Sequence, residues 1–146
     1  MAVDSPAPAH SVTKSVSIDC APDDVFDFIA DAGNWPRSAI VNVQSVRRGA
    51  DPEWWEMQTP RGPGRLRILG DRASGILDHQ FENQEAHWTV PARVVQNGRG
   101  AEFMMTFFQP RAFSDDFFTQ QIALVDIELN ELKKILESSS RPSPAT

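Results

Sequence analysis

The segment GILDHQF, residues 75–81, places an aspartate next to a histidine, two residue types that often share proton-transfer chemistry. The alternation of apolar and polar residues in this segment is typical of a β-strand. Neighbours on a strand point to opposite faces of the sheet, so Asp78 and His79 cannot act as one unit. One of the two must face the interior. An inward imidazole could act as a general acid or base, contact a ligand, or serve as a wall residue of a cavity.

A turn signal near residue 97 sets the register of the last two predicted strands. Asn97 followed by Gly98 predicts a two-residue hairpin turn, which places Gln96 opposite Arg99. Residues at every second position along both strands are apolar, and we assign this face to the interior. The predicted inward pairs are Val94 with Ala101, Ala92 with Phe103, Val90 with Met105, and Trp88 with Phe107.

The preceding turn decides between Asp78 and His79. A two-residue turn at 83–84 places His79 opposite Trp88 and directs the imidazole inward. A three-residue loop would reverse the parity and direct Asp78 inward. The residues on either side of His79 on its own face are apolar, which favours the inward histidine.

Other kinds of catalytic or metal site find little support. Cys20 is the single cysteine, which excludes an intrachain disulfide and a thiolate metal cluster. The three histidines, His10, His79 and His87, are too scattered for a zinc site, so we expect no metal. The sequence contains no GxSxG, P-loop or GxGxxG motif, and we expect no cofactor.

The length, net charge and hydropathy of the chain limit the classes of protein to which it can belong. A chain of 146 residues with 40% hydrophobic content fits one domain. Its net charge of -6 argues against a nucleic-acid partner. No segment approaches the length of an apolar membrane span, and the first residues lack a signal-peptide pattern, so we expect a cytoplasmic protein with no integral membrane association. We expect residues 1–10 and 139–146 to be disordered tails on either side of a single domain at 11–138.

The predicted elements form a simple order. A strand at 11–19 precedes a helix at 21–35 that Gly33 ends, and a second short helix or turn at 34–38 follows. Six further strands are predicted as an antiparallel meander, at 40–48, 53–59, 65–71, 75–81, 86–95 and 101–109. A long helix starts near Ser114. Its apolar stripe for burial is Phe118, Ile122, Val125, Leu129, Leu132 and Leu136. We therefore predict an α+β fold with a curved antiparallel sheet of about seven strands around a long C-terminal helix.

This order, together with three stretches, resembles the SRPBCC superfamily of START-like, helix-grip proteins. The stretches are VSIDCAPDDVFDFIADAGNWPRS (16–38), VPARVVQNGRGAEFMMTFFQ (90–109) and SDDFFTQQIALVDIELNELKKILE (114–137). The second half is similar to a bacterial, polyketide cyclase/dehydratase-like branch without an assigned activity. The resemblance implies a helix-grip fold and a cavity for an apolar or amphipathic small molecule, but no particular catalytic residue.

Three functions are compatible with these features. The first is a binding protein for a hydrophobic small molecule or lipid, either a monomer or a homodimer. The second is a cyclase- or dehydratase-type enzyme with His79 as its acid or base. The third is a partner-binding or chaperone-like module that uses an apolar patch around Trp54 and Phe108. The residues expected to line the cavity are Trp35, as a gate at its mouth, and Leu77, His79, Trp88, Val90, Met105, Phe107, Phe118, Ile122 and Val125.

Overall fold

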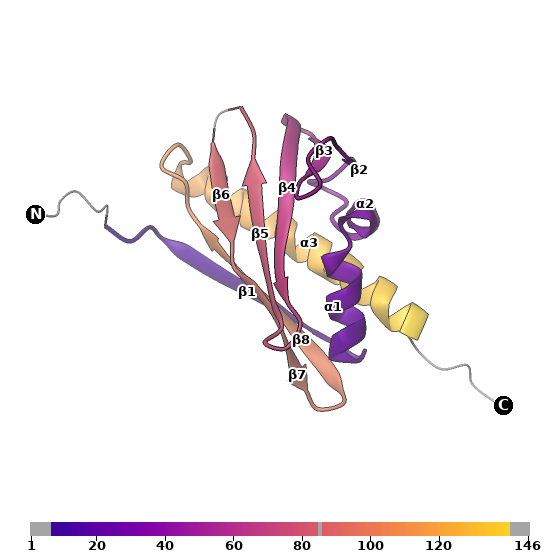
Figure 1. Ribbon diagram of the computed structural model, residues 1–146. Coiled ribbons are helices and arrows are strands. Elements are labelled where there is room, and N and C mark those ends of the chain that lie inside the picture. The colour runs from indigo at the N-terminus through magenta and orange to yellow at the C-terminus, as the bar shows by residue number, and fades with distance from the viewer. Residues whose placement is uncertain (1–6, 85, 141–146) are drawn as a thin grey trace, which may run out of the picture.

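The computed structural model describes residues 7–84 and 86–140. These residues form eight β-strands, three α-helices and one 3-10 turn (Figure 1). The helical elements are α1 (Pro22–Ala30), η1 (Ala32–Asn34), α2 (Trp35–Ser38) and α3 (Asp115–Ser140). The strands are β1 (Ser11–Ile18), β2 (Ser45–Arg48), β3 (Trp55–Thr59), β4 (Gly62–Asp71), β5 (Ile76–Glu82), β6 (His87–Val90), β7 (Ala92–Asn97) and β8 (Gly100–Phe108). Residues 1–6 and 141–146 of the predicted tails lie outside the described residues.

All strands belong to one antiparallel sheet. Its order is β1-β8-β7-β5-β4-β3-β2, and β6 pairs with β5 beside this path. The long helix α3 crosses one face of the sheet, and α1 and α2 lie against the C-terminal part of that helix (Figure 1). This arrangement is the predicted α+β fold with a long helix across an antiparallel sheet. We call the sheet face that packs against α3 the inner face.

The sheet has one strand more than predicted because the expected strand at 86–95 is interrupted at Pro91. Proline has no N–H to donate to a neighbouring strand. On one side of Pro91, β6 pairs with β5, and on the other side β7 pairs with β8. The N–H of Ala92, next to the break, donates to Asp78 Oδ1 at 3.1 Å. Asp78 thus lies on the outer face and has a structural partner.

Both predicted hairpin registers are wrong by two residues, yet both inner faces are right. The turn of the β7–β8 hairpin lies at Gly98 and Arg99, with Gly98 at a φ of 59°, so Val94 faces Phe103 rather than Ala101. Between β5 and β6, Glu82 pairs with His87, which leaves residues 83–86 as the connection. A shift of two residues preserves the parity of a strand.

The first helix ends earlier than predicted. Asp31 leaves the helical conformation, and its carboxylate accepts the N–H of Gly33 at 2.9 Å. The chain then makes the η1 turn and enters α2 at Trp35. The predicted 21–35 helix is therefore divided into α1 and η1, and the predicted short helix at 34–38 is present as α2. This change of direction places Trp35 over the inner face of the sheet.

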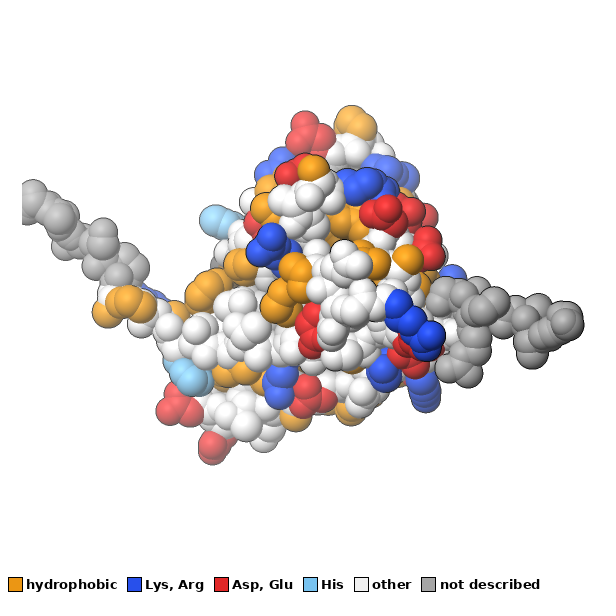
Figure 2. Space-filling model, turned by 90° about the horizontal axis from the view of Figure 1, so that it is seen from below, with side chains coloured by type: hydrophobic (Ala, Val, Ile, Leu, Met, Phe, Trp, Pro, Cys, Tyr) orange, Lys and Arg blue, Asp and Glu red, His pale blue; other side chains and the backbone are white. Residues whose placement is uncertain are grey.

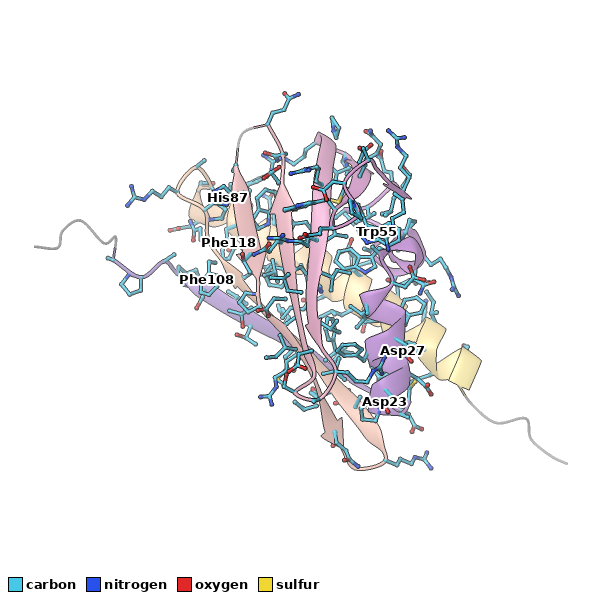
Figure 3. The ribbon with its side chains drawn as sticks, in the orientation of Figure 1. Asp23, Asp27, Trp55, His87, Phe108 and Phe118 are labelled. Carbon is cyan, nitrogen blue, oxygen red and sulfur yellow. The ribbon has the colours of Figure 1, made fainter. Side chains whose placement is uncertain are left out.

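The core lies between the inner face, α1 and the C-terminal half of α3. Every residue of the predicted α3 stripe is buried. The stripe divides, however: Val125, Leu129, Leu132 and Leu136 belong to the continuous hydrophobic cluster, whereas Phe118 and Ile122 are buried outside it. Phe118 lies at the opposite end of the molecule from Asp23 and Asp27 of α1 (Figure 3).

Candidate functional site

His79 lies on the inner face at the centre of β5. Its partners across the two neighbouring strands are Ile68 of β4 and Val90 of β6. The side chain is 2% exposed, as the inward prediction required. The prediction that it faces Trp88 is wrong, because the register is shifted by two residues and Trp88 pairs with Phe81 instead.

Both ring nitrogens of His79 lack a hydrogen-bond partner. The imidazole instead meets aromatic rings, with centroid distances of 4.7 Å to Trp35 and 6.2 Å to Phe81. Burial in these surroundings lowers the pKa of His79 from 6.5 to about 3. The ring is therefore neutral near pH 7, with one N–H donor and one acceptor nitrogen, both unused. An unsatisfied buried polar group lowers folding stability by about 1–3 kcal/mol, so the two unpaired ring nitrogens need an explanation.

Trp35 covers His79 from the side of α2. Its indole Nε1 donates to the carbonyl oxygen of Ile29 at 2.8 Å, and the side chain is 7% exposed. Because its only polar atom is committed to α1, Trp35 presents only its ring to His79. The prediction placed Trp35 at a cavity mouth, and the structure places it in direct contact with the histidine.

The other predicted cavity residues fall into two groups. Leu77, Val90, Phe118, Ile122 and Val125 are buried. Met105 and Phe107 lie on the inner face of β8 but are only half-buried, and Trp88 is 42% exposed. The Trp88 ring stacks on Phe81 with a centroid distance of 5.4 Å. A row of inward-facing apolar side chains thus becomes progressively more open toward β6 and the C-terminal end of β8.

Two surface pockets of the structure lie elsewhere. One, of about 430 Å³, is lined by residues of β2 to β5 and the connection after β5, among them Arg47 and Glu82. The other, of about 490 Å³, lies between the start of α1 and the β4–β5 turn. Neither is lined by any of the ten predicted cavity residues. His79 itself is 2% exposed, so its side chain is closed off from solvent in this conformation.

A partly buried carboxylate that the sequence analysis missed links α3 to the segment after α2. Glu128 accepts hydrogen bonds from the backbone N–H groups of Val41 and Asn42 at 3.0 and 2.8 Å, and from the Asn42 side chain at 3.1 Å. Burial raises the pKa of Glu128, and the three donors partly oppose that shift. A sequence signal exists, because Glu128 lies three residues after Val125 and four before Leu132, on the apolar face of the helix.

Several charged groups elsewhere form ion pairs. Lys14, on the inner face of β1, contacts Asp126 of α3 at 3.2 Å. On the outer face, Arg65 pairs with Glu82 at 2.7 Å. Acidic and basic side chains are interspersed on the surface seen in Figure 2. Among residues 7–84 and 86–140, no three metal-binding side chains come together. No helix of the described chain is long and apolar enough to span a membrane.

Comparisons with known proteins agree with this architecture. Residues 9–137 match the sequence family described as polyketide cyclase/dehydrase and lipid transport. No curated protein matches the chain.

Among solved structures, the Zhui aromatase/cyclase from Streptomyces sp. R1128 has a TM-score of 0.72 at 14% identity, with 94% of this chain and 99% of that chain covered. The Aha1 dimer from Colwellia psychrerythraea has a TM-score of 0.70 at 10% identity, with 88% and 96% covered. An uncharacterised protein from Bacillus thuringiensis has a TM-score of 0.68 at 14% identity, with 87% and 98% covered. At these identities the likeness shows a shared fold.

Proposed function

The chain belongs to the polyketide cyclase/dehydrase and lipid transport family of the SRPBCC superfamily, and from that premise we propose that it binds an apolar or amphipathic small molecule. The proposed site lies between the inner face around His79 and the N-terminal half of α3. One observation carries the proposal: a fully buried imidazole, surrounded by aromatic rings, has two unused hydrogen-bonding atoms. A ligand with a polar group would satisfy at least one of them.

Packing around α3 supports this location. Val90, Phe118 and Ile122 are buried but lie outside the continuous hydrophobic cluster of the core. Met105 and Phe107 face inward without being fully covered. An apolar ligand would add the missing contact surface at about 25 cal/mol for each Å² removed from water. Because His79 is closed off from solvent, the side chains that cover it must move to admit a ligand, and Trp35 is one of them.

The lowered pKa of His79 supports a role in ligand binding rather than in proton transfer. A general acid must hold its proton near the working pH, and a pKa of about 3 leaves the imidazole neutral there. A nitrogen of such low basicity is also a poor general base. We therefore assign His79 a ligand-contact role and no catalytic role.

The partner-binding alternative lacks its expected surface. The Trp54 ring lies under the guanidinium groups of Arg65 and Arg67, at 4.4 and 4.8 Å from the ring centroid. Phe108 is 50% exposed at the end of β8. A tryptophan covered by two cations is a poor centre for an apolar patch.

Filling the proposed site tests the proposal. We expect Ile122→Trp to weaken the binding of an apolar probe, naphthalene, at least tenfold in calorimetric titration, because the larger ring occupies the ligand's space. The matched control is Ile127→Trp on the same helix, where the native side chain is 50% exposed. Circular dichroism melting curves would establish that both variants fold. Equal naphthalene affinity in the two folded variants, or no binding to the native protein, would contradict the proposal.

A further inference from the structure

We infer that the molecule bound at this site places an uncharged hydroxyl or carbonyl group against His79, so that the site selects neutral molecules over carboxylates. This inference rests on the binding site proposed above and adds the chemistry of its polar contact.

The hydrogen-bonding capacity of His79 defines the polar group. A neutral imidazole offers one N–H donor and one acceptor nitrogen, and both are unpartnered here. A hydroxyl group can accept from the donor or donate to the acceptor, and a carbonyl oxygen can accept from the donor. A carboxylate, like a carbonyl, can only accept and so can pair only with the N–H, whereas a hydroxyl group can pair with either nitrogen. The match in hydrogen bonding therefore favours a hydroxyl group.

The charges around the site disfavour an anion. Neither nitrogen of His79 has a charged group within hydrogen-bond distance among the described residues. Lys14, the inward cation of β1, contacts Asp126 at 3.2 Å. A carboxylate brought to His79 would lose its hydration without gaining a counterion, which disfavours its binding.

The aromatic neighbours of His79 leave the polar contact to the histidine. The Trp35 indole N–H is already donated to Ile29, and Phe81 has no polar atom. His79 is therefore the polar anchor of an otherwise apolar wall. The rest of the ligand would extend toward Met105 and Phe107, whose inward side chains are half-buried.

Three probes of similar size separate the possibilities: naphthalene, 1-naphthol, and 1-naphthoate, which is ionised at pH 7. For the native protein in calorimetric titration, we expect 1-naphthol to bind about fivefold more tightly than naphthalene, since one net hydrogen bond contributes about 1 kcal/mol. We expect 1-naphthoate to bind most weakly. In His79→Leu the preference for 1-naphthol should disappear, and in His79→Gln, which keeps a donor and an acceptor, part of it should return.

His87→Leu, which changes an exposed histidine on β6, is the matched control and should bind like the native protein. Melting curves would show that each variant is folded. An unchanged preference for 1-naphthol in folded His79→Leu, or 1-naphthoate binding as tightly as 1-naphthol, would overturn this inference while naphthalene binding still supported the proposed site. Failure of all three probes to bind would overturn both.

Discussion

Asp78 and His79 are neighbours in the chain with opposite physical situations. The Asp78 carboxylate accepts the N–H of Ala92 at 3.1 Å, which satisfies an amide next to the strand break. His79, on the other face, is buried without a hydrogen-bond partner. The aspartate therefore has a structural reason for its position, whereas the histidine reduces stability in the unliganded protein. A residue that is kept at a cost to stability is a reasonable place to look for function.

The unpaired imidazole predicts an acid-sensitive stability. Its pKa falls from 6.5 to about 3 on folding, so below pH 6.5 the unfolded chain gains a proton that the folded protein does not. Stability should fall as the pH drops from 6.5 toward 3, and the free energy of unfolding contributed by His79 should be about 2 kcal/mol lower at pH 5 than at pH 7. Urea unfolding at both pH values would measure this loss, which His79→Gln should remove.

His87→Gln is the control for this experiment, because it makes the same substitution at an exposed histidine of β6. An equal decline in stability for the native protein and for His79→Gln would show that other groups cause the acid sensitivity.

At the scale of elements, the sequence predicted which residues face inward better than it predicted where strands pair. The period of two along β5, β7 and β8 survives an error of two residues in each turn, so His79 and Val94 lie on the expected face. The break at Pro91 was missed because apolar residues continue on both sides of it. Whether the nitrogens of His79 find hydrogen-bond partners depends on which side chains approach from α2. A single sequence does not contain that information.

The contact between Glu128 and the segment after α2 gives a second prediction. Glu128→Ala leaves the partly buried N–H groups of Val41 and Asn42 without their acceptor, so we expect a loss of about 1–3 kcal/mol in urea unfolding. Glu128→Gln can keep its amide oxygen on both N–H groups while the Asn42 amide turns to present its oxygen. This variant should unfold at nearly the native urea concentration.

The pH dependence of stability distinguishes the native Glu128 from the Glu128→Gln variant. A pKa raised by burial means that the stability contributed by Glu128 is complete below pH 4.5 and is lost as the pH rises through the higher folded value. Glu128→Gln has no such titration and should lose that part of the pH dependence. Glu131→Gln, at an acid on the same helix that pairs with Lys134 instead, is the matched control. If Glu128→Ala were as stable as Glu131→Gln, the three hydrogen bonds would not hold this segment to α3.

At the scale of the molecule, α3 connects the hydrophobic core, which stabilises the fold, with the proposed binding site. Its C-terminal half packs into the continuous core with α1 and the sheet, and Lys133 and Glu137 add hydrogen bonds to the end of β1 at 2.6 and 2.9 Å. Its N-terminal half carries Phe118 and Ile122, which are buried outside that cluster. The packed C-terminal half can hold the helix in place while side chains around the proposed site move.

This division predicts that the molecule depends on the C-terminal half of α3 for folding. A chain ending at Asp126 lacks Leu129, Leu132 and Leu136, whose burial contributes about 5–9 kcal/mol at 1.5–3 kcal/mol for each side chain. That loss is comparable to the whole stability of a domain, so the shortened chain should show no cooperative unfolding and no near-ultraviolet circular dichroism. Leu129→Ala in the full chain should lose about 2–5 kcal/mol and stay folded, whereas Ile127→Ala, at an exposed position, should change little. Cooperative unfolding of the shortened chain would instead place the stabilising core within the sheet and α1.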